Sequence, residues 1–302
     1  MSTTGLAQVV RLAALLALAL VAVPGPSSGS PTARGVEYHD PSWAPDGKRI
    51  AFASDLADPG RRFDDIYVMN LDGTGLRRLT TSDLGEAGPA WSPDGKEIAF
   101  QAYASIDVVN VGDGTRRRVA ETACCNPEWS PRGRKIAYTW FNETSGGRIY
   151  VVDRAGKRRE LVAAPRADGY SYGSPTWSPD GERMAFSVGT APDSNAVTPY
   201  LGILSRYRGR VTAVARGHSF GWPDWSPDGR RILFSEFLPK SRAPRISVLN
   251  LRTRRITRLR AGYHGRWSPD GRQIVFAGPD LGIYVMRADG SHVRRVEPRP
   301  TG

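Results

Sequence analysis

Short apolar segments separated by polar turns make up most of this chain. In residues 89–100, PAWSPDGKEIAF, one apolar segment ends at Trp91, a polar turn follows, and Ile98-Ala99-Phe100 begins the next segment. Segments of this length, rich in β-branched and aromatic residues and bounded by Gly, Pro and Asp, are typical of β-strands. The pattern therefore predicts many short strands, and the 33 glycines and 23 prolines disfavour long helices.

The same segment occurs six times along the chain. Its tryptophans are Trp43, Trp91, Trp129, Trp177, Trp225 and Trp267, at spacings of 48, 38, 48, 48 and 42 residues. Self-similarity at this period indicates a repeat architecture, and one propeller blade of four strands takes ~40–50 residues. We predict an all-β fold, a six-bladed β-propeller of four-stranded antiparallel blades over residues 36–297, with residues 298–302 as a tail.

Each repeat contains the elements of one blade. The first strand ends at the tryptophan, and Pro-Asp-Gly then forms a tight turn, because proline presets φ and glycine accepts a left-handed conformation. The third strand is represented by Ile66-Tyr67-Val68 and the fourth by Arg77-Arg78-Leu79. A lone blade cannot bury both faces, so we expect the large tryptophan side chain to pack between neighbouring blades.

The repeated Trp-Ser-Pro-Asp-Gly motif resembles the WD40-like repeats of the propeller domain in the TolB family, the periplasmic component of the Tol–Pal system. The resemblance covers about residues 36–297 and implies the propeller fold; it is far less specific for function, because such repeats also occur in peptidases and lyases. Three repeats depart from the motif, with Ala44, Arg132 and Gly265 in place of serine, aspartate and proline. We expect no α/β domain of the TolB type ahead of the repeats.

The N-terminal segment resembles an export signal. Arg11 is the only charged residue among the first 30, and an apolar run from Leu12 to Val23 follows it. This length suits a signal peptide and is short for a membrane span. We expect residues 1–30 to be a signal peptide cleaved between residues 23 and 34, with a retained anchor as the alternative. The mature protein is then periplasmic, cell-wall associated or secreted, and not an integral membrane protein.

The charge is strongly basic, with a formal net charge of +12 over 302 residues. Such a balance suits nucleic acid, an anionic polymer or a membrane surface, and it also occurs on a merely solvated surface. The export signal disfavours nucleic acid. Many arginines fall in the predicted outer strands and their hairpins: Arg77, Arg78, Arg116, Arg117, Arg118, Arg158, Arg159, Arg208, Arg210, Arg252, Arg254, Arg255, Arg294 and Arg295.

The two cysteines, Cys124 and Cys125, are adjacent. Neighbouring Cα atoms are about 3.8 Å apart, which is below the usual range for a disulfide. A strained vicinal disulfide and a pair of free thiols are the alternatives, and we favour free thiols.

Two segments match the Gly-x-Ser-x-Gly pattern of hydrolase nucleophiles, GYSYG at residues 169–173 and GHSFG at residues 217–221. Both begin eight residues before a repeat tryptophan, so they are the same segment in successive blades. A nucleophile elbow leads from a strand into a helix, whereas these segments lead into a strand. We predict that Ser171 and Ser219 are loop residues, and we expect neither a catalytic residue nor a cofactor.

Aromatic and histidine residues gather just before the tryptophan in several repeats. We predict that loops leading into the innermost strands carry them at the mouth of the central channel, where a rigid scaffold presents a binding surface. The candidate partner-binding residues are Tyr170, Tyr172, His218, Phe220, Trp222, Tyr263 and His264. The alternative is that these side chains only plug the channel mouth.

Three histidines, His39, His218 and His264, precede the tryptophans of neighbouring blades one, five and six. They form a weak candidate set for zinc or manganese, and propeller lyases use histidine-rich metal sites. The sequence thus predicts an exported, monomeric, non-catalytic binding module for a protein or an envelope polymer. A metal-assisted lyase or hydrolase at the channel mouth is the alternative.

Overall fold

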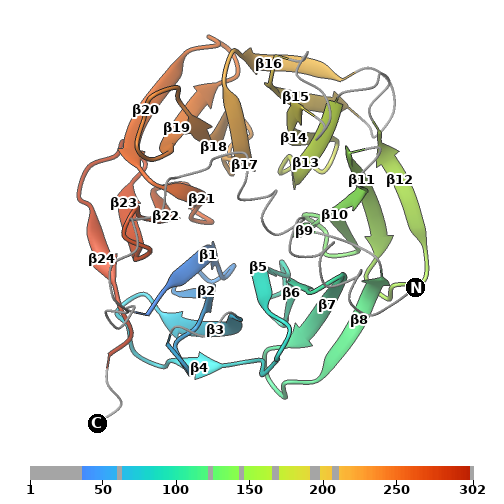
Figure 1. Cartoon of the computed structure of the whole chain (residues 1–302), viewed down its shortest axis with the longest axis vertical. Helices are drawn as coiled ribbons and strands as arrows, with labels where there is room; N and C mark the ends of the chain where they lie inside the picture. Colours follow the sequence, from blue (N-terminus) through green and yellow to red (C-terminus); the bar gives the residue numbers. More distant parts are fainter. Residues whose placement is uncertain are drawn as a thin grey trace, which may run out of the picture.

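The computed structural model describes residues 36–59, 63–121, 125–142, 146–164, 170–190, 198–205 and 211–299. In these residues, strands β1–β24 form six four-stranded sheets around a central axis, and no helix occurs (Figure 1). The predicted all-β, six-bladed propeller is confirmed. The described residues contain no helix of the length and apolarity that a membrane crossing needs.

The strands of the first three blades have the following bounds. Blade 1 comprises β1 (Tyr38–Trp43), β2 (Arg49–Ser54), β3 (Asp65–Asn70) and β4 (Arg77–Arg78). Blade 2 comprises β5 (Glu86–Trp91), β6 (Glu97–Ala102), β7 (Ser105–Asn110) and β8 (Arg116–Glu121). Blade 3 comprises β9 (Cys125–Trp129), β10 (Lys135–Asn142), β11 (Gly146–Asp153) and β12 (Arg159–Ala163).

The other three blades follow the same order. Blade 4 comprises β13 (Tyr170–Trp177), β14 (Arg183–Thr190), β15 (Tyr200–Ser205) and β16 (Thr212–Arg216). Blade 5 comprises β17 (Ser219–Trp225), β18 (Arg231–Phe237), β19 (Arg245–Asn250) and β20 (Ile256–Ala261). Blade 6 comprises β21 (Tyr263–Trp267), β22 (Gln273–Ala277), β23 (Ile283–Arg287) and β24 (Arg294–Val296).

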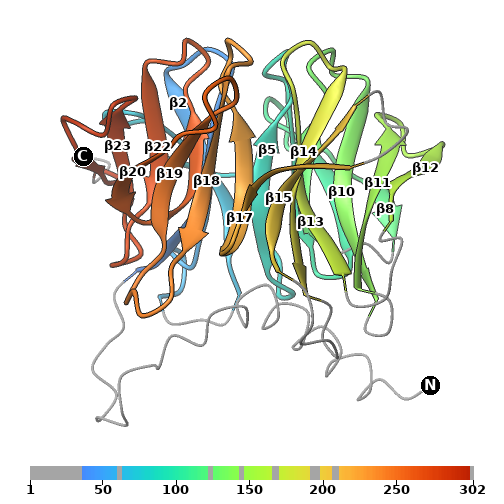
Figure 2. The same ribbon diagram turned by 90° about the horizontal axis from the view of Figure 1, so that it is seen from above.

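Each blade is one continuous stretch of chain, with its first strand innermost and its fourth outermost (Figures 1 and 2). The ring closes where β1 contacts β21, β22 and β23. At this seam, Trp43 and Ile50 of blade 1 share one apolar cluster with Val275 and Val285 of blade 6. Side-chain packing therefore holds the first and last blades together, as it does the other neighbours.

The recurring turn after each tryptophan is closed by its own side chains. Ser92 Oγ donates to Asp94 Oδ1 (2.6 Å) and accepts from Glu97 N (2.9 Å), while Asp94 Oδ1 accepts from Lys96 N (3.1 Å). Burial acts to raise the pKa of Asp94, but these hydrogen bonds and Arg154 outweigh it and lower the pKa to about 2. The serine and aspartate therefore fix the turn that joins the two inner strands.

The third repeat keeps this turn although Arg132 replaces the aspartate. Ser130 Oγ still accepts a hydrogen bond from Lys135 N at 3.0 Å, and Gly133 keeps a φ of +65°. The serine and the glycine therefore suffice for the turn in this blade.

The six repeat tryptophans are buried between blades, with exposed fractions of 4–8%. An arginine lies over four of them, from the preceding blade for Trp91, Trp225 and Trp267 and from the same blade for Trp129. Arg183 lies 4.6 Å from the ring centre of Trp225, and Arg231 lies 4.6 Å from that of Trp267. Arg49 covers Trp91 at 5.0 Å, and Arg154 covers Trp129 at 5.2 Å. A cation above an indole face adds electrostatic attraction to apolar burial, which strengthens the contact between blades.

Cys125 is the first residue of β9, and it is disulfide-bonded. The prediction of two free thiols is therefore wrong for Cys125. Cys124 and the predicted signal segment, residues 1–30, lie outside the described residues.

The first prediction concerns the packing between blades. Trp177→Ala should lower the free energy of unfolding by ~3–5 kcal/mol, because it removes a large aromatic side chain that is 6% exposed. Asp180→Ala should cost much less, since blade 3 forms the same turn without an aspartate. Chemical denaturation of both variants checks this. A larger loss from Asp180→Ala than from Trp177→Ala would contradict the structural role assigned to the tryptophan.

Candidate functional site

Every innermost strand has a residue in the left-handed region three positions before its tryptophan. The residues and their φ angles are Asp40 (50°), Gly88 (58°), Asn126 (55°), Ser174 (51°), Trp222 (49°) and His264 (52°). In all six blades the pairing with the second strand shifts register at this residue, which marks a β-bulge. Positive φ is costly for residues other than glycine, and such strain concentrates at functional sites.

The residue just before the tryptophan lines the central channel. In blades 3, 5 and 6 this residue is charged: Glu128, Asp224 and Arg266. Arg266 Nη1 lies 3.4 Å from Asp224 Oδ1 of the neighbouring blade and 3.6 Å from Glu128 Oε2. Because β9 and β21 lie on opposite sides of the ring, the contact between Arg266 and Glu128 spans the channel (Figure 1).

These three side chains are largely buried, and burial raises the pKa of the two carboxyl groups. Burial raises the pKa of Glu128 to about 7, although the Arg266 charge opposes the shift. Burial also raises the pKa of Asp224, whose Oδ2 accepts a hydrogen bond from Trp267 N at 2.7 Å. The layer therefore carries one guanidinium and two carboxyl groups, and it bridges the channel beneath its mouth.

The layer nearer the mouth is built around His264. Its Nδ1 is in contact with Asp40 Oδ1 across the closing seam of the ring, and Asp40 Oδ2 accepts a hydrogen bond from Gly88 N at 2.9 Å. The ring of Trp222 lies over the imidazole, with the two ring centres 3.7 Å apart. Burial lowers the pKa of His264 well below its usual value, and the Arg266 charge adds to this effect. His264 is therefore neutral near pH 7; its Nδ1–H donates to Asp40, and Nε2 remains a hydrogen-bond acceptor.

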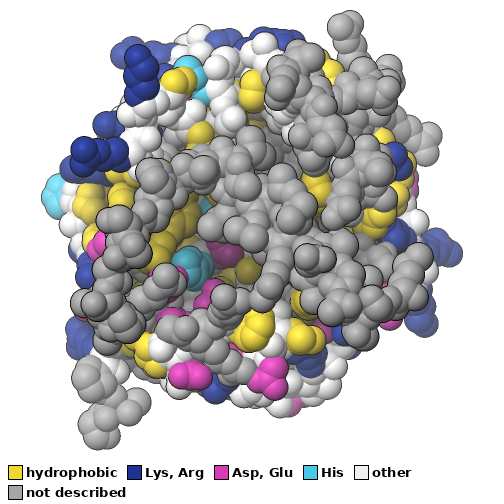
Figure 3. Space-filling model, in the orientation of Figure 1, with side chains coloured by type: hydrophobic (Ala, Val, Ile, Leu, Met, Phe, Trp, Pro, Cys, Tyr) yellow, Lys and Arg dark blue, Asp and Glu magenta, His cyan; other side chains and the backbone are white. Residues whose placement is uncertain are grey.

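On the blade 1 side of the mouth, acidic groups surround His39. His39 Nε2 lies 3.4 Å from Glu37 Oε2 and 4.0 Å from Asp64 Oδ2. Burial raises the pKa of Asp64 to about 6, although the charge on His39 opposes the shift. Among the side chains visible in Figure 3, acidic and histidine side chains lie at the centre of this face, and Lys and Arg lie toward its edge, where some acidic side chains also lie. The visible centre of the mouth is therefore acidic, and the basic side chains are kept to the edge.

The predicted binding residues divide into two groups. Trp222, Tyr263 and His264 lie together at the channel, where Tyr263 contacts both of the others. Tyr172 and Phe220 lie between blades, each 6% exposed. Their rings pack against Phe186 and Phe234, so they belong to the core of the ring.

The predicted placement of these residues in loops is wrong in most cases. Tyr170, Ser171 and Tyr172 belong to β13, and Ser219, Phe220 and Trp222 belong to β17. The innermost strands begin earlier than the motif indicates, because their pairing with the second strands continues past the bulge. Ser171 Oγ accepts a hydrogen bond from Gly147 N at 2.9 Å, which joins neighbouring blades. His218 alone precedes its strand.

Sequence reasoning missed the polar residues Asp40, Glu128, Asp224 and Arg266. The available signal was their fixed offset from the repeat tryptophan, one or three positions before it. Side chains at equal offsets in a ring of equivalent blades face the same axis. Superposing the six repeats at the tryptophan therefore identifies these layers, whereas a search for aromatic residues does not.

The predicted histidine metal set is not assembled. Within the ranges that the structure describes, no group of three or more His, Cys, Asp or Glu side chains is arranged to hold a metal ion. His39 and His264 are close enough to affect each other's charge, and each contacts a carboxylate. His218 precedes β17, and its buried Nδ1 has no hydrogen-bond partner within the part of the chain that the structure describes.

Part of the predicted basic rim is tied to acids of the blades. Arg78 Nη2 lies 2.6 Å from Asp65 Oδ2, and Arg116 bridges Glu86 (2.6 Å) and Asp107 (2.8 Å). Several rim arginines therefore fix the outer strands to the sheet.

The fold and the channel define a class: a six-bladed β-propeller whose innermost strands present a polar ring to a central channel. TolB from Acinetobacter baumannii is similar in structure, with a TM-score of 0.68 and 19% identity over 93% of this chain and 66% of that one. A protein assigned as TolB in Agrobacterium tumefaciens has a TM-score of 0.64 and 22% identity, covering 75% of this chain and 86% of that one. An oligogalacturonate lyase in complex with manganese has a TM-score of 0.60 and 18% identity, covering 87% of this chain and 78% of that one.

These likenesses establish the fold, and they confirm the predicted resemblance to the TolB propeller. The chain spans 66% of the length of the Acinetobacter baumannii TolB chain. No protein-family profile and no curated protein matches the sequence.

The second prediction concerns the charged layer in the channel. The pKa of Glu128 rises from 4.5 to about 7 on folding, so the folded state holds this proton more tightly than the unfolded state. The resulting stability is fully present below about pH 4.5 and is lost as the pH rises through about 7. Glu128→Gln removes this loss, so the stability of the variant relative to wild type should increase between pH 4.5 and 8.

Urea unfolding across that pH range tests this. Glu160→Gln, a change of an exposed carboxylate on β12, is the matched control and should follow the wild-type pH profile. A Glu128→Gln profile that runs parallel to wild type would show that folding does not raise the pKa of this carboxyl group.

Proposed function

We propose that this protein is an exported, non-catalytic binding module that takes up a segment of a partner protein, or of an envelope polymer, at the mouth of its central channel. The observation that carries the proposal is the ring of six left-handed residues, five of them not glycine, on the innermost strands. Every blade has a left-handed backbone residue at the same height in the channel. Such repeated strain is typical of a binding surface that is preorganised for a ligand.

The geometry supports a partner segment that enters at the mouth and ends within the channel. A segment entering there meets Trp222 and His264 first, and its path ends at the ion pair between Arg266 and Glu128. Trp222 offers an aromatic face, His264 Nε2 an acceptor, and Asn126 and Ser174 further polar groups. Aromatic residues in largely desolvated sites dominate binding energy, so we expect Trp222 to contribute most.

The acidic groups of the mouth favour a particular ligand charge. Glu37, Asp40 and Asp64 lie on the blade 1 side, and their field attracts a cationic side chain or amine. The likeness to TolB propellers supports a partner that is a protein. We propose that the module acts as a monomer in the periplasm, at the cell wall or in secreted form.

Site-specific photo-crosslinking in the producing cell tests the binding face. Benzoylphenylalanine in place of Ser174, a ring residue, should yield an adduct with a discrete partner, whereas the same group in place of Thr253 should not. Thr253 lies in the exposed hairpin between β19 and β20 at the other end of the blades. Trp222→Ala, added to the Ser174 crosslinker protein, should reduce the adduct at least about tenfold, because loss of an aromatic anchor costs 2 kcal/mol or more.

An adduct from position 253 with none from position 174 would move the binding face away from the mouth. An adduct from position 174 that persists unchanged in the Trp222→Ala background would exclude Trp222 as the anchor. Circular dichroism of each variant separates loss of binding from loss of fold.

Export has its own test. Protein recovered from the envelope or the medium should begin between residues 23 and 34, because the apolar run before that region is removed by cleavage. Intact-mass measurement of the recovered chain checks this. A chain that keeps Met1 and remains in the membrane fraction would favour a retained anchor.

A further inference from the structure

A cleft between blades 1 and 2 has no part in the channel site. It has a volume of about 470 Å³ and opens on the face that carries the Pro-Asp-Gly turns, opposite the mouth. Residues of β2, β3, β4 and the end of β7 line it together with the β3–β4, β5–β6 and β7–β8 turns, and none of the lining residues belongs to an innermost strand. Its size falls within the range of small-ligand sites, which is ~300–1,000 Å³.

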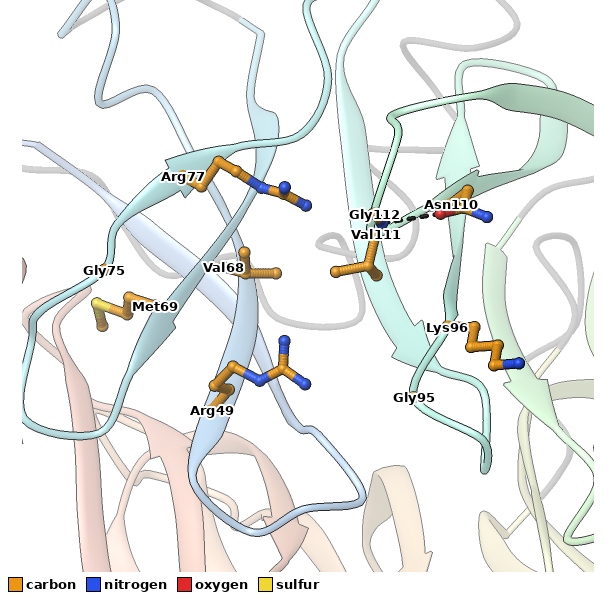
Figure 4. Close-up of a pocket in the computed structure, with 10 residues that line it drawn as sticks. All are labelled: Arg49, Val68, Met69, Gly75, Arg77, Gly95, Lys96, Asn110, Val111 and Gly112. Carbon is orange, nitrogen blue, oxygen red and sulfur yellow. Dashed lines mark hydrogen bonds between the residues drawn. The ribbon is translucent and has the colours of Figure 1, made fainter.

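The cleft has an apolar floor and two basic groups above it. Val68 of β3 and Val111 after β7 face each other across the gap, and both are buried, with exposed fractions of 5% and 8%. In Figure 4, the side chains of Arg49 and Arg77 extend toward this gap, whereas Lys96 extends away from it. The arrangement therefore offers guanidinium groups next to an apolar surface.

The two arginines differ in how their charge is balanced. Arg49 Nε lies 2.8 Å from Asp46 Oδ2, and its guanidinium lies over Trp91 at 5.0 Å, so its position is fixed. Arg77 makes no ion pair with any residue of the described ranges, and none of the ten lining residues is acidic. Its neighbour Arg78 is paired with Asp65, so among the described residues β4 balances one arginine and leaves the next without a counter-charge.

We propose that this cleft binds an oxyanion, a phosphate or carboxylate group that carries a small apolar moiety, with Arg77 as the principal ligand and Arg49 beside it. Guanidinium groups bind both oxyanions through paired N–H donors. The apolar moiety of the ligand then lies on Val68 and Val111. This contact removes the apolar surface of the ligand from water. Such groups occur along anionic polymers, so the cleft would hold the propeller to one while its mouth stays open.

Calorimetric titration of the whole protein with phenyl phosphate, benzoate and inorganic phosphate tests the proposal at low salt. Phenyl phosphate or benzoate should bind saturably at one site per chain, and inorganic phosphate should bind more weakly than phenyl phosphate because it lacks the apolar ring. Whichever ring compound binds more tightly identifies the preferred oxyanion. Arg77→Gln should weaken that binding about tenfold, as expected for loss of one charge-assisted hydrogen-bonding group.

Arg252→Gln is the matched control, because it removes the same charge from an exposed hairpin of blade 5 and should leave the affinity unchanged. Trp222→Ala should also leave it unchanged, so failure of the mouth site and failure of the cleft are distinguishable. Equal weakening by Arg77→Gln and Arg252→Gln, or no saturable binding of either ring compound, would overturn the proposal.

Discussion

The packing of one tryptophan per blade against its neighbour is the interaction on which the ring depends. Each blade is a continuous segment of chain, and no strand of the described residues crosses from one blade to another, so side-chain packing is the main contact at the seams. The tryptophans are nearly inaccessible at every seam, and four carry an arginine over the indole, three of these from the preceding blade. Apolar burial provides most of the attraction, and the cation over the ring adds to it.

A rigid ring allows the innermost strands to hold conformations that a looser sheet would relax. Left-handed residues such as Trp222 and His264 are costly for an isolated strand. Here the indole Nε1 of Trp43 donates to the carbonyl of Arg266, and that of Trp177 donates to the carbonyl of Glu128, so the seams also fix the channel residues. The same side-chain layer that closes the ring thus positions the candidate site.

Charge is distributed unevenly over this basic molecule. The mouth gathers Glu37, Asp40 and Asp64, while the outer strands carry many arginines, several of them paired with blade carboxylates. Two kinds of ligand therefore suit two faces: a cationic group at the mouth and an oxyanion in the cleft beside Arg77. The two faces lie at opposite ends of the blades, so both ligands are able to bind at once.

The sequence by itself determined the number of blades, the turn chemistry and the role of the tryptophans, because each of these repeats at a fixed spacing. Tertiary structure decided the site. The contact between Glu128 and Arg266 joins residues 138 positions apart across the channel, and Asp40 meets His264 only because the ring closes. Local pattern also misplaced Tyr172 and Phe220, since an aromatic residue before the tryptophan suits either a binding face or a seam. The bulge before each tryptophan decides which way these side chains point, and that geometry follows from pairing between strands rather than from composition.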